Sequence, residues 1–248
     1  MTKHIAFILL LGMAVTATSC RNKTQAPTDT VSSGVIKISV DESFRPLIQE
    51  EIDVYEGLYP AAGLIPEYTS EVEAINLLLK DSVRLTVSTR RLTEAEINGL
   101  QEKKLFPKEI KIATDGIALI THKQNADTIL SVPDLTKILT GKITQWSELD
   151  PKSKLGKIQV VFDNSNSSTI RYAIDSLCKG QPLYQGLTAL GTNPQVIDYV
   201  AKTPNALGVI GVSWIGNKAD STNLSFSERI NVMRISRENP ALVANSCK

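Results

Sequence analysis

The chain has 248 residues, of which 42% are hydrophobic and 21% are charged, so it can bury a sizeable core. Its 27 lysines and arginines almost balance its 26 acidic residues, which argues against a protein that binds nucleic acid through bulk charge. Only two histidines are present, His4 and His122, so a zinc site with several histidines is excluded. The three cysteines are widely spaced, and we expect no metal site and no cofactor.

The N-terminus has the pattern of an export signal. A short basic start precedes an apolar run at residues 5–17, which is shorter than the roughly 20 residues of a membrane-spanning helix. We therefore predict a signal peptide at residues 1–19. Small residues lead to Cys20, as in the lipobox of bacterial lipoproteins, which predicts lipidation of Cys20. An ordinary cleaved signal beside an unrelated cysteine is the alternative.

Residues 20–34 are polar and contain almost no apolar side chain, so they predict a lipid-anchored flexible tether. Such a tether would hold a soluble body at a membrane in the periplasm or cell envelope. Disulfides persist in exported proteins, so Cys178 and Cys247 could form one. Two free thiols are the alternative, because the sequence gives no distance between them.

Strand and helix patterns alternate in the first part of the body. Alternating, β-branched runs predict strands at residues 35–40, 63–68 and 84–88. Helical spacing predicts helices after Ser43, from Ser70 and from Thr93, and a glutamate three residues after each of the last two completes a capping-box pattern. This β-α-β-α-β-α order indicates a parallel sheet, which binds ligands beyond the carboxyl ends of its strands.

The alternation continues in the second part. Strands are predicted at residues 111–121, 158–162, 207–211 and 230–235. Helices are predicted at residues 132–140 and 169–177 and from Asn193, with Pro194 in the first turn. We expect Trp146 to pack in the core and assign no catalytic role to His122.

Several predicted helices begin with polar turns. The turns at residues 41–44, 68–71 and 162–168 each combine hydroxyl groups with the free backbone N–H groups of a helix start, which favours a bound anion. Residues 88–91 add Arg90 and Arg91, which point opposite ways on an extended segment. Ordinary helix capping is the alternative explanation for any single turn.

Catalytic motifs are missing from the sequence. It contains no G-x-S-x-G, H-E-x-x-H, P-loop or G-x-G-x-x-G motif. The carboxylate pairs Asp41–Glu42 and Glu50–Glu51 are sequence neighbours and do not indicate a glycosidase. We therefore expect a protein that is not an enzyme.

Longer motifs resemble those of a known family. The stretch ATDGIA at residues 113–118 precedes ILTGKITQWS at 138–147, which looks like the family's IFxGKIxxW, and residues 193–215 are similar to its V…PxAIGY segment. With these motifs, residues 35–235 resemble the phosphate-binding proteins of ABC transporters, in the type II periplasmic binding-protein superfamily.

The resemblance implies an α/β fold of two lobes, joined by two crossover strands around an interlobe cleft. Residues 35–114 and 212–248 would form lobe I, and residues 115–211 would form lobe II. The crossovers would lie near residues 115–116 and 207–211.

The resemblance also implies where a ligand binds. The family's hydroxyl residue before phenylalanine, its serine at the second helix, its turn after the third strand and its RxDGSGT loop all have counterparts here. The implied ligand-binding residues are Ser43, Ser70, Thr89, Arg90, Ser165, Asn166 and Ser167.

Two residues depart from the family pattern. Val161 stands where the family has an arginine that pairs with the anion, and Thr89 stands where many members have an aspartate that accepts a proton from phosphate. The candidates for the missing positive charge are Arg90 and Arg171. The candidates for the missing acceptor are Asp41, Glu71 and Asp163.

The resemblance implies a solute-binding lipoprotein that captures phosphate or a related oxyanion for the membrane subunits of an ABC importer. No nucleic-acid partner is expected. The alternative is a binding-protein-like fold with a degraded anion site, acting as an envelope interaction or adhesion module. A hydrolase is a third interpretation, for which the sequence offers no motif.

Overall fold

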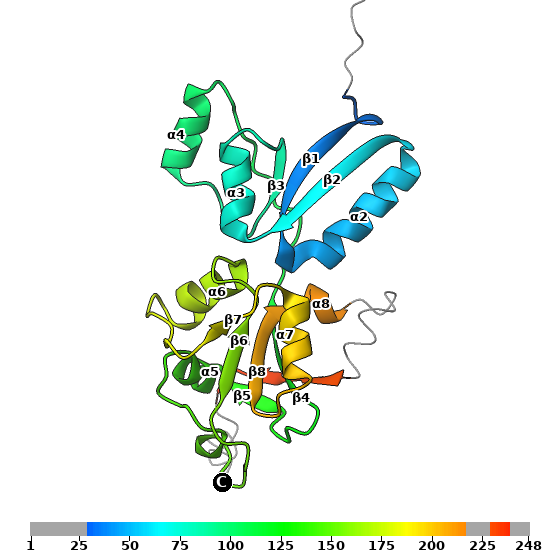
Figure 1. Cartoon of the computed structure of the whole chain (residues 1–248). Helices are drawn as coiled ribbons and strands as arrows, with labels where there is room; N and C mark the ends of the chain where they lie inside the picture. The colour runs from blue at the N-terminus through cyan, green and yellow to red at the C-terminus, as the bar shows by residue number, and fades with distance from the viewer. Residues whose placement is uncertain (1–28, 217–228, 239–248) are drawn as a thin grey trace, which may run out of the picture.

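The structure, a computed structural model, describes residues 29–216 and 229–238. The predicted signal peptide, Cys20, most of the tether and Cys247 lie outside these residues. The described residues form two α/β lobes, and the segment 103–116 leads from one to the other (Figure 1). Within these residues no helix has the length and apolar character needed to cross a membrane.

The first lobe is built on a three-stranded parallel sheet in the order β2-β1-β3. Its strands are β1 (Ser33–Asp41), β2 (Ala61–Thr69) and β3 (Leu85–Val87). Its helices are the 3-10 turn η1 (Glu42–Phe44), α2 (Arg45–Leu58), α3 (Glu71–Leu79) and α4 (Glu94–Glu102). Each strand is followed by a helix, so the alternation predicted from the sequence is confirmed.

Capping side chains set where these helices begin. The Thr93 hydroxyl accepts the N–H of Glu96, and the Glu96 carboxylate accepts the N–H of Thr93, so the predicted capping box is present. The Ser70 hydroxyl accepts the N–H of Glu73 at 3.4 Å and caps α3. Ser43 is not a cap: Asp41 caps η1, and Ser43 lies within that turn. Each such cap contributes about 1 kcal/mol.

The second lobe is built on a five-stranded sheet in the order β7-β6-β8-β4-β9, in which β4 runs antiparallel to its two neighbours. Its strands are β4 (Ile117–His122), β6 (Gln159–Phe162), β7 (Thr188–Ala189), β8 (Ala206–Gly211) and β9 (Ile230–Val232). A separate parallel pair consists of β5 (Ile129–Ser131) and β10 (Arg234–Ser236).

Helices cover both faces of this sheet (Figure 1). They are α5 (Val132–Leu139), η2 (Trp146–Glu148), α6 (Ser168–Tyr172), its π-helical continuation η3 (Ala173–Leu177), α7 (Asn193–Val200) and α8 (Ser213–Gly216). All the predicted helices of this part are found, with the one at 169–177 beginning at Ser168.

The structure corrects one expectation about how the lobes divide. Residues 207–211, expected in lobe II near the second crossover, belong to β8, which lies between β6 and β4 of the second lobe and is buried along its whole length. Residues 230–236 were assigned to lobe I, but β9 pairs with β4 and β10 with β5, in the second lobe. The reason is that β9 covers the open edge of β4 and buries Ile230 there.

The core of the second lobe has two parts, one on each face of the sheet. Along β8, Leu207 and Val209 point to the cluster around Trp146, and Ala206 and Ile210 point to the cluster against α7. Trp146 is fully buried and its indole N–H donates to the Asn205 carbonyl at 2.9 Å, so its predicted packing role is confirmed.

We predict that Gly208→Ala destabilises the protein by about 1–3 kcal/mol, because it overpacks this core. A Cβ at residue 208 would lie 2.7–2.9 Å from side-chain atoms of Ile120, Val200 and Val196. Gly99→Ala is the matched control, since a Cβ there meets nothing within 4 Å and α4 should gain up to about 1 kcal/mol. Urea unfolding of both variants is the measurement, and equal stabilities would contradict the packing argument.

Candidate functional site

The two lobes meet where several helices begin. The Ser168 hydroxyl donates to that of Ser43 at 3.4 Å, and the Ser213 hydroxyl donates to the Ser43 carbonyl at 2.6 Å. The backbone N–H of Val72 donates to the carbonyl of Asn166 at 3.4 Å. The starts of η1, α3 and α6 therefore lie at one place, which we call the junction (Figure 1).

Gly211 allows the lobes to approach each other at the junction. A Cβ at this residue would lie 3.1 Å from the Ser43 carbonyl oxygen. Its N–H donates to the side-chain oxygen of Asn193 at 3.1 Å, which holds the end of β8 against the start of α7. A side chain at residue 211 would push Ser43 away from the second lobe.

Asp163 organises the polar turn of the second lobe. Its carboxylate is buried and accepts the Ser167 hydroxyl at 2.7 Å, the Thr169 hydroxyl at 2.5 Å and the Asn193 amide at 3.4 Å. Burial raises the pKa of Asp163, and the hydroxyl donors oppose that shift. The Ser167 hydroxyl also accepts the N–H of Ile170, so Ser167 caps α6.

Asn193 is a residue of the junction that the sequence did not single out. Its amide also donates to Glu42 of the first lobe at 2.6 Å, so one side chain bridges the lobes. The two acids that it contacts are 30 and 151 residues away in sequence. No local pattern could have revealed these contacts.

The structure brings some of the predicted ligand residues together and leaves others apart. Ser43 and Ser167 are buried at the junction, and Ser70 caps α3 beside it. Ser165 and Asn166 are exposed on the turn before α6. Asn166 contacts the first lobe through its carbonyl, which accepts the N–H of Val72.

Arg90 is turned toward α4. Its guanidinium makes two hydrogen bonds to the Glu96 carboxylate, at 2.8 and 2.7 Å. This ion pair holds the pKa of Glu96 at about 2. Arg90 therefore stabilises the start of α4, whereas the guanidinium of Arg171 lies at the junction.

Arg171 crosses from the second lobe to the first. Its Nε donates to Glu71 Oε2 at 2.6 Å, and one terminal nitrogen donates to Glu71 Oε1 at 3.2 Å and to the Thr89 hydroxyl. The Glu71 side chain is only 2% exposed. Burial alone would raise the pKa of Glu71, but hydrogen bonds from Arg171 and Thr89 hold it below its usual value. Glu71 is therefore the ionised partner of Arg171 at neutral pH.

Two further acids at the junction, Asp41 and Glu42, have pKa values above those of ordinary carboxyl groups. Asp41 is fully buried, its Oδ1 accepts the N–H of Ser43 at 3.1 Å, and its Oδ2 has no hydrogen-bond partner. Burial raises the pKa of Asp41 to about 6, although the Ser168 hydroxyl and the Ser43 N–H lower it. Burial likewise raises the pKa of Glu42 to about 7, against the bonds from Asn193. Near neutral pH the junction is thus less negative than its four carboxyl groups suggest.

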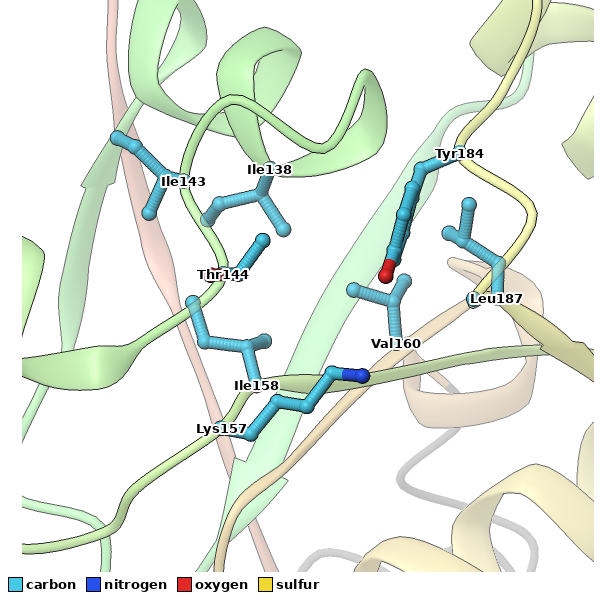
Figure 2. Close-up of a pocket in the computed structure, with 9 residues that line it drawn as sticks. Ile138, Ile143, Thr144, Lys157, Ile158, Val160, Tyr184 and Leu187 are labelled. Carbon is cyan, nitrogen blue, oxygen red and sulfur yellow. The ribbon is translucent and has the colours of Figure 1, made fainter.

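A separate pocket lies in the second lobe, between α5, β6 and Tyr184 (Figure 2). Its lining is apolar except for Thr144 and Lys157, and the Lys157 ammonium lies 5.9 Å from the centre of the Tyr184 ring. The ring packs against Gly141 and Gly186, where a Cβ would approach to within 2.7 and 2.2 Å of it. This arrangement closes the core of the lobe and offers no set of donors to an anion.

A family model described as a PBP superfamily domain matches residues 23–246. The chain belongs to the PBP superfamily. Two relatives named phosphate-binding protein PstS agree with this membership. The one from Bacillus subtilis (strain 168) is 24% identical over 225 residues, covering 86% of this chain and 71% of the relative. The one from Borreliella burgdorferi is 23% identical over 225 residues, covering 89% and 76%.

Solved structures share the fold. A protein from Clostridium perfringens, assigned as a phosphate ABC transporter substrate-binding protein and solved with bound phosphate, superposes with a TM-score of 0.66. It is 23% identical, and the match covers 86% of this chain and 82% of that one. The regulatory domain of OxyR2 from Vibrio vulnificus has a TM-score of 0.55 at 13% identity, covering 84% and 83%. The expected two-lobed α/β fold is confirmed, and a regulatory domain shares it.

We predict that Asp41→Asn stabilises the protein by about 3 kcal/mol at pH 8 and much less at pH 4. The folded chain holds the Asp41 proton up to a pKa of about 6, whereas the ordinary value is 3.8. The free energy of unfolding should therefore fall as the pH rises between these values, and the variant should lack this loss. Glu51→Gln, on the exposed face of α2, is the control and should change stability by less than about 0.5 kcal/mol at either pH. Urea unfolding at both pH values is the measurement, and identical pH profiles for Asp41→Asn and the native chain would rule the effect out.

Proposed function

We propose that this protein binds phosphate or a related oxyanion at the junction and delivers it to an ABC importer. The observation that carries the proposal is that hydroxyl groups and helix starts of both lobes meet around Ser43, Ser168 and Arg171. The names of its relatives, phosphate-binding protein PstS, support the same ligand class. They favour transport over an envelope adhesion module and give no support to a hydrolase.

Binding would rest on neutral donors and one cation. The hydroxyls of Ser43, Ser70 and Ser168 and the first N–H groups of α6 would donate to the oxygens of the anion. Arg171 would supply the positive charge that the family places at the position of Val161 here. No bond is made or broken in such a cycle, so the proposal requires no catalytic residue.

An acid at the junction would distinguish phosphate from sulfate. Phosphate at neutral pH carries a proton to donate, whereas sulfate only accepts hydrogen bonds. The Oδ2 of Asp41 has no hydrogen-bond partner and would accept such a proton, whereas a carboxylate there would repel sulfate. Asp41 would then provide, from the end of β1, the acceptor that Thr89 cannot provide.

We also propose that the protein works outside the cytoplasmic membrane, held there by lipid on Cys20. The apolar run at residues 5–17 and the polar tether at 20–34 support this placement. The membrane subunits of the importer would be the protein partner. Lipidation is tested by mass spectrometry of the protein from membranes, where Cys20→Ser should abolish the lipid-modified form.

We predict that phosphate binds the purified protein with a heat measurable by calorimetry and that Ser43→Ala weakens binding about tenfold, since one hydrogen bond is lost. Ser82→Ala, on an exposed turn after α3, is the matched control and should leave the affinity unchanged. Absence of heat and of thermal stabilisation with phosphate, arsenate, sulfate and molybdate would overturn the proposed function.

A further inference from the structure

Glu71 is held in the way that a binding protein holds an anion. Its carboxylate accepts the backbone N–H groups of Thr89 and Arg90, at 2.8 and 3.2 Å, and the Thr89 hydroxyl at 2.5 Å. From the other lobe it accepts two bonds from Arg171. Donors of both lobes thus converge on a carboxylate that belongs to the chain itself.

A further donor beside Glu71 is also satisfied by the protein. The N–H of Val72, in the first turn of α3, would be free to hold a ligand, but it donates to the carbonyl of Asn166. The lobes are therefore joined at this point by their own polar groups. An oxyanion placed beside ionised Glu71 would meet a like charge at contact distance, which disfavours binding of both at once.

We propose that Glu71 is an internal ligand of the junction, which an incoming oxyanion displaces from Arg171. This inference rests on the proposed function and adds a residue that sets its affinity and selectivity. A dianion with three or four oxygens can replace both oxygens of the carboxylate on Arg171 and Thr89. A halide is a single atom, so it cannot replace both oxygens of the carboxylate.

The alternative role for Glu71 is to position Thr89, Arg90 and Arg171 for a ligand that binds elsewhere at the junction. The two roles predict opposite effects. If Glu71 competes with the ligand, removal of its charge strengthens binding, whereas if it positions the ligand groups, removal weakens binding.

Calorimetry with inorganic phosphate at pH 7.5 distinguishes these roles in the Glu71→Gln variant. Glutamine keeps the shape of the side chain and one acceptor oxygen but cannot form an ion pair with Arg171. We expect the affinity for phosphate to rise about tenfold or more, because a charge-assisted contact no longer competes. Glu73→Gln is the matched control, since Glu73 lies on the same helix, pairs at the surface with Lys80 and should alter the affinity less than about twofold.

A second pair of variants ties the effect to Arg171. The gain in phosphate affinity should vanish when Arg171→Gln is combined with Glu71→Gln, because that gain comes from the guanidinium that Glu71 no longer occupies. Glu71→Ser removes the carboxylate altogether and should reproduce the gain, so a folding defect in one variant does not decide the outcome. Circular dichroism and thermal melting identify the folded variants.

The outcomes separate this inference from the proposed function. Tighter binding by Glu71→Gln that depends on Arg171 supports the inference, even where the native chain binds too weakly to measure. Equal or weaker binding by the folded variants overturns it and leaves phosphate binding by the native chain intact. Absence of binding by the native chain and by every variant overturns both.

Discussion

The ion pair between Glu71 and Arg171 is the interaction on which the junction depends. A buried carboxylate is costly unless donors surround it, and Glu71 is satisfied only because Thr89 and Arg90 of its own lobe and Arg171 of the other lobe converge on it. The pair therefore does more than add surface charge. It couples the position of α3 to that of α6, and any ligand that changes it changes how the two lobes meet.

The cost of burying a charged carboxylate also explains the pKa values of the other acids at the junction. Four carboxyl groups lie near one another at the junction, and Arg171 contacts one of them, Glu71. Hydrogen bonds from Arg171 and Thr89 hold the pKa of Glu71 below its usual value. Burial raises the pKa of the other three acids, to about 6 for Asp41 and about 7 for Glu42, although hydroxyl donors oppose the shift at Asp163. Such a junction presents donors and acceptors side by side, as a protonated oxyanion requires.

Local features of the fold could be predicted from the sequence, and long-range features could not. The strand at 35–40 and the capping box of Thr93 depend on neighbours within a few residues, and both were predicted. Residues 230–236 were assigned to lobe I, whereas β9 and β10 pair with β4 and β5 of the second lobe, because pairing between strands far apart in the chain leaves no local signal. The contacts of Asn193 span up to 151 residues, so only the folded chain reveals them.

The fold itself does not decide the function, since a phosphate-binding structure and a regulatory domain both share it. The argument for an oxyanion therefore rests on the junction. The family arginine is missing at Val161, but Arg171, in the first turn of α6, gives the junction a positive charge, because its guanidinium contacts Glu71 of the first lobe. In the proposed function, this relocation of the charge would connect ligand capture to the contact between the lobes, because Arg171 already contacts the first lobe.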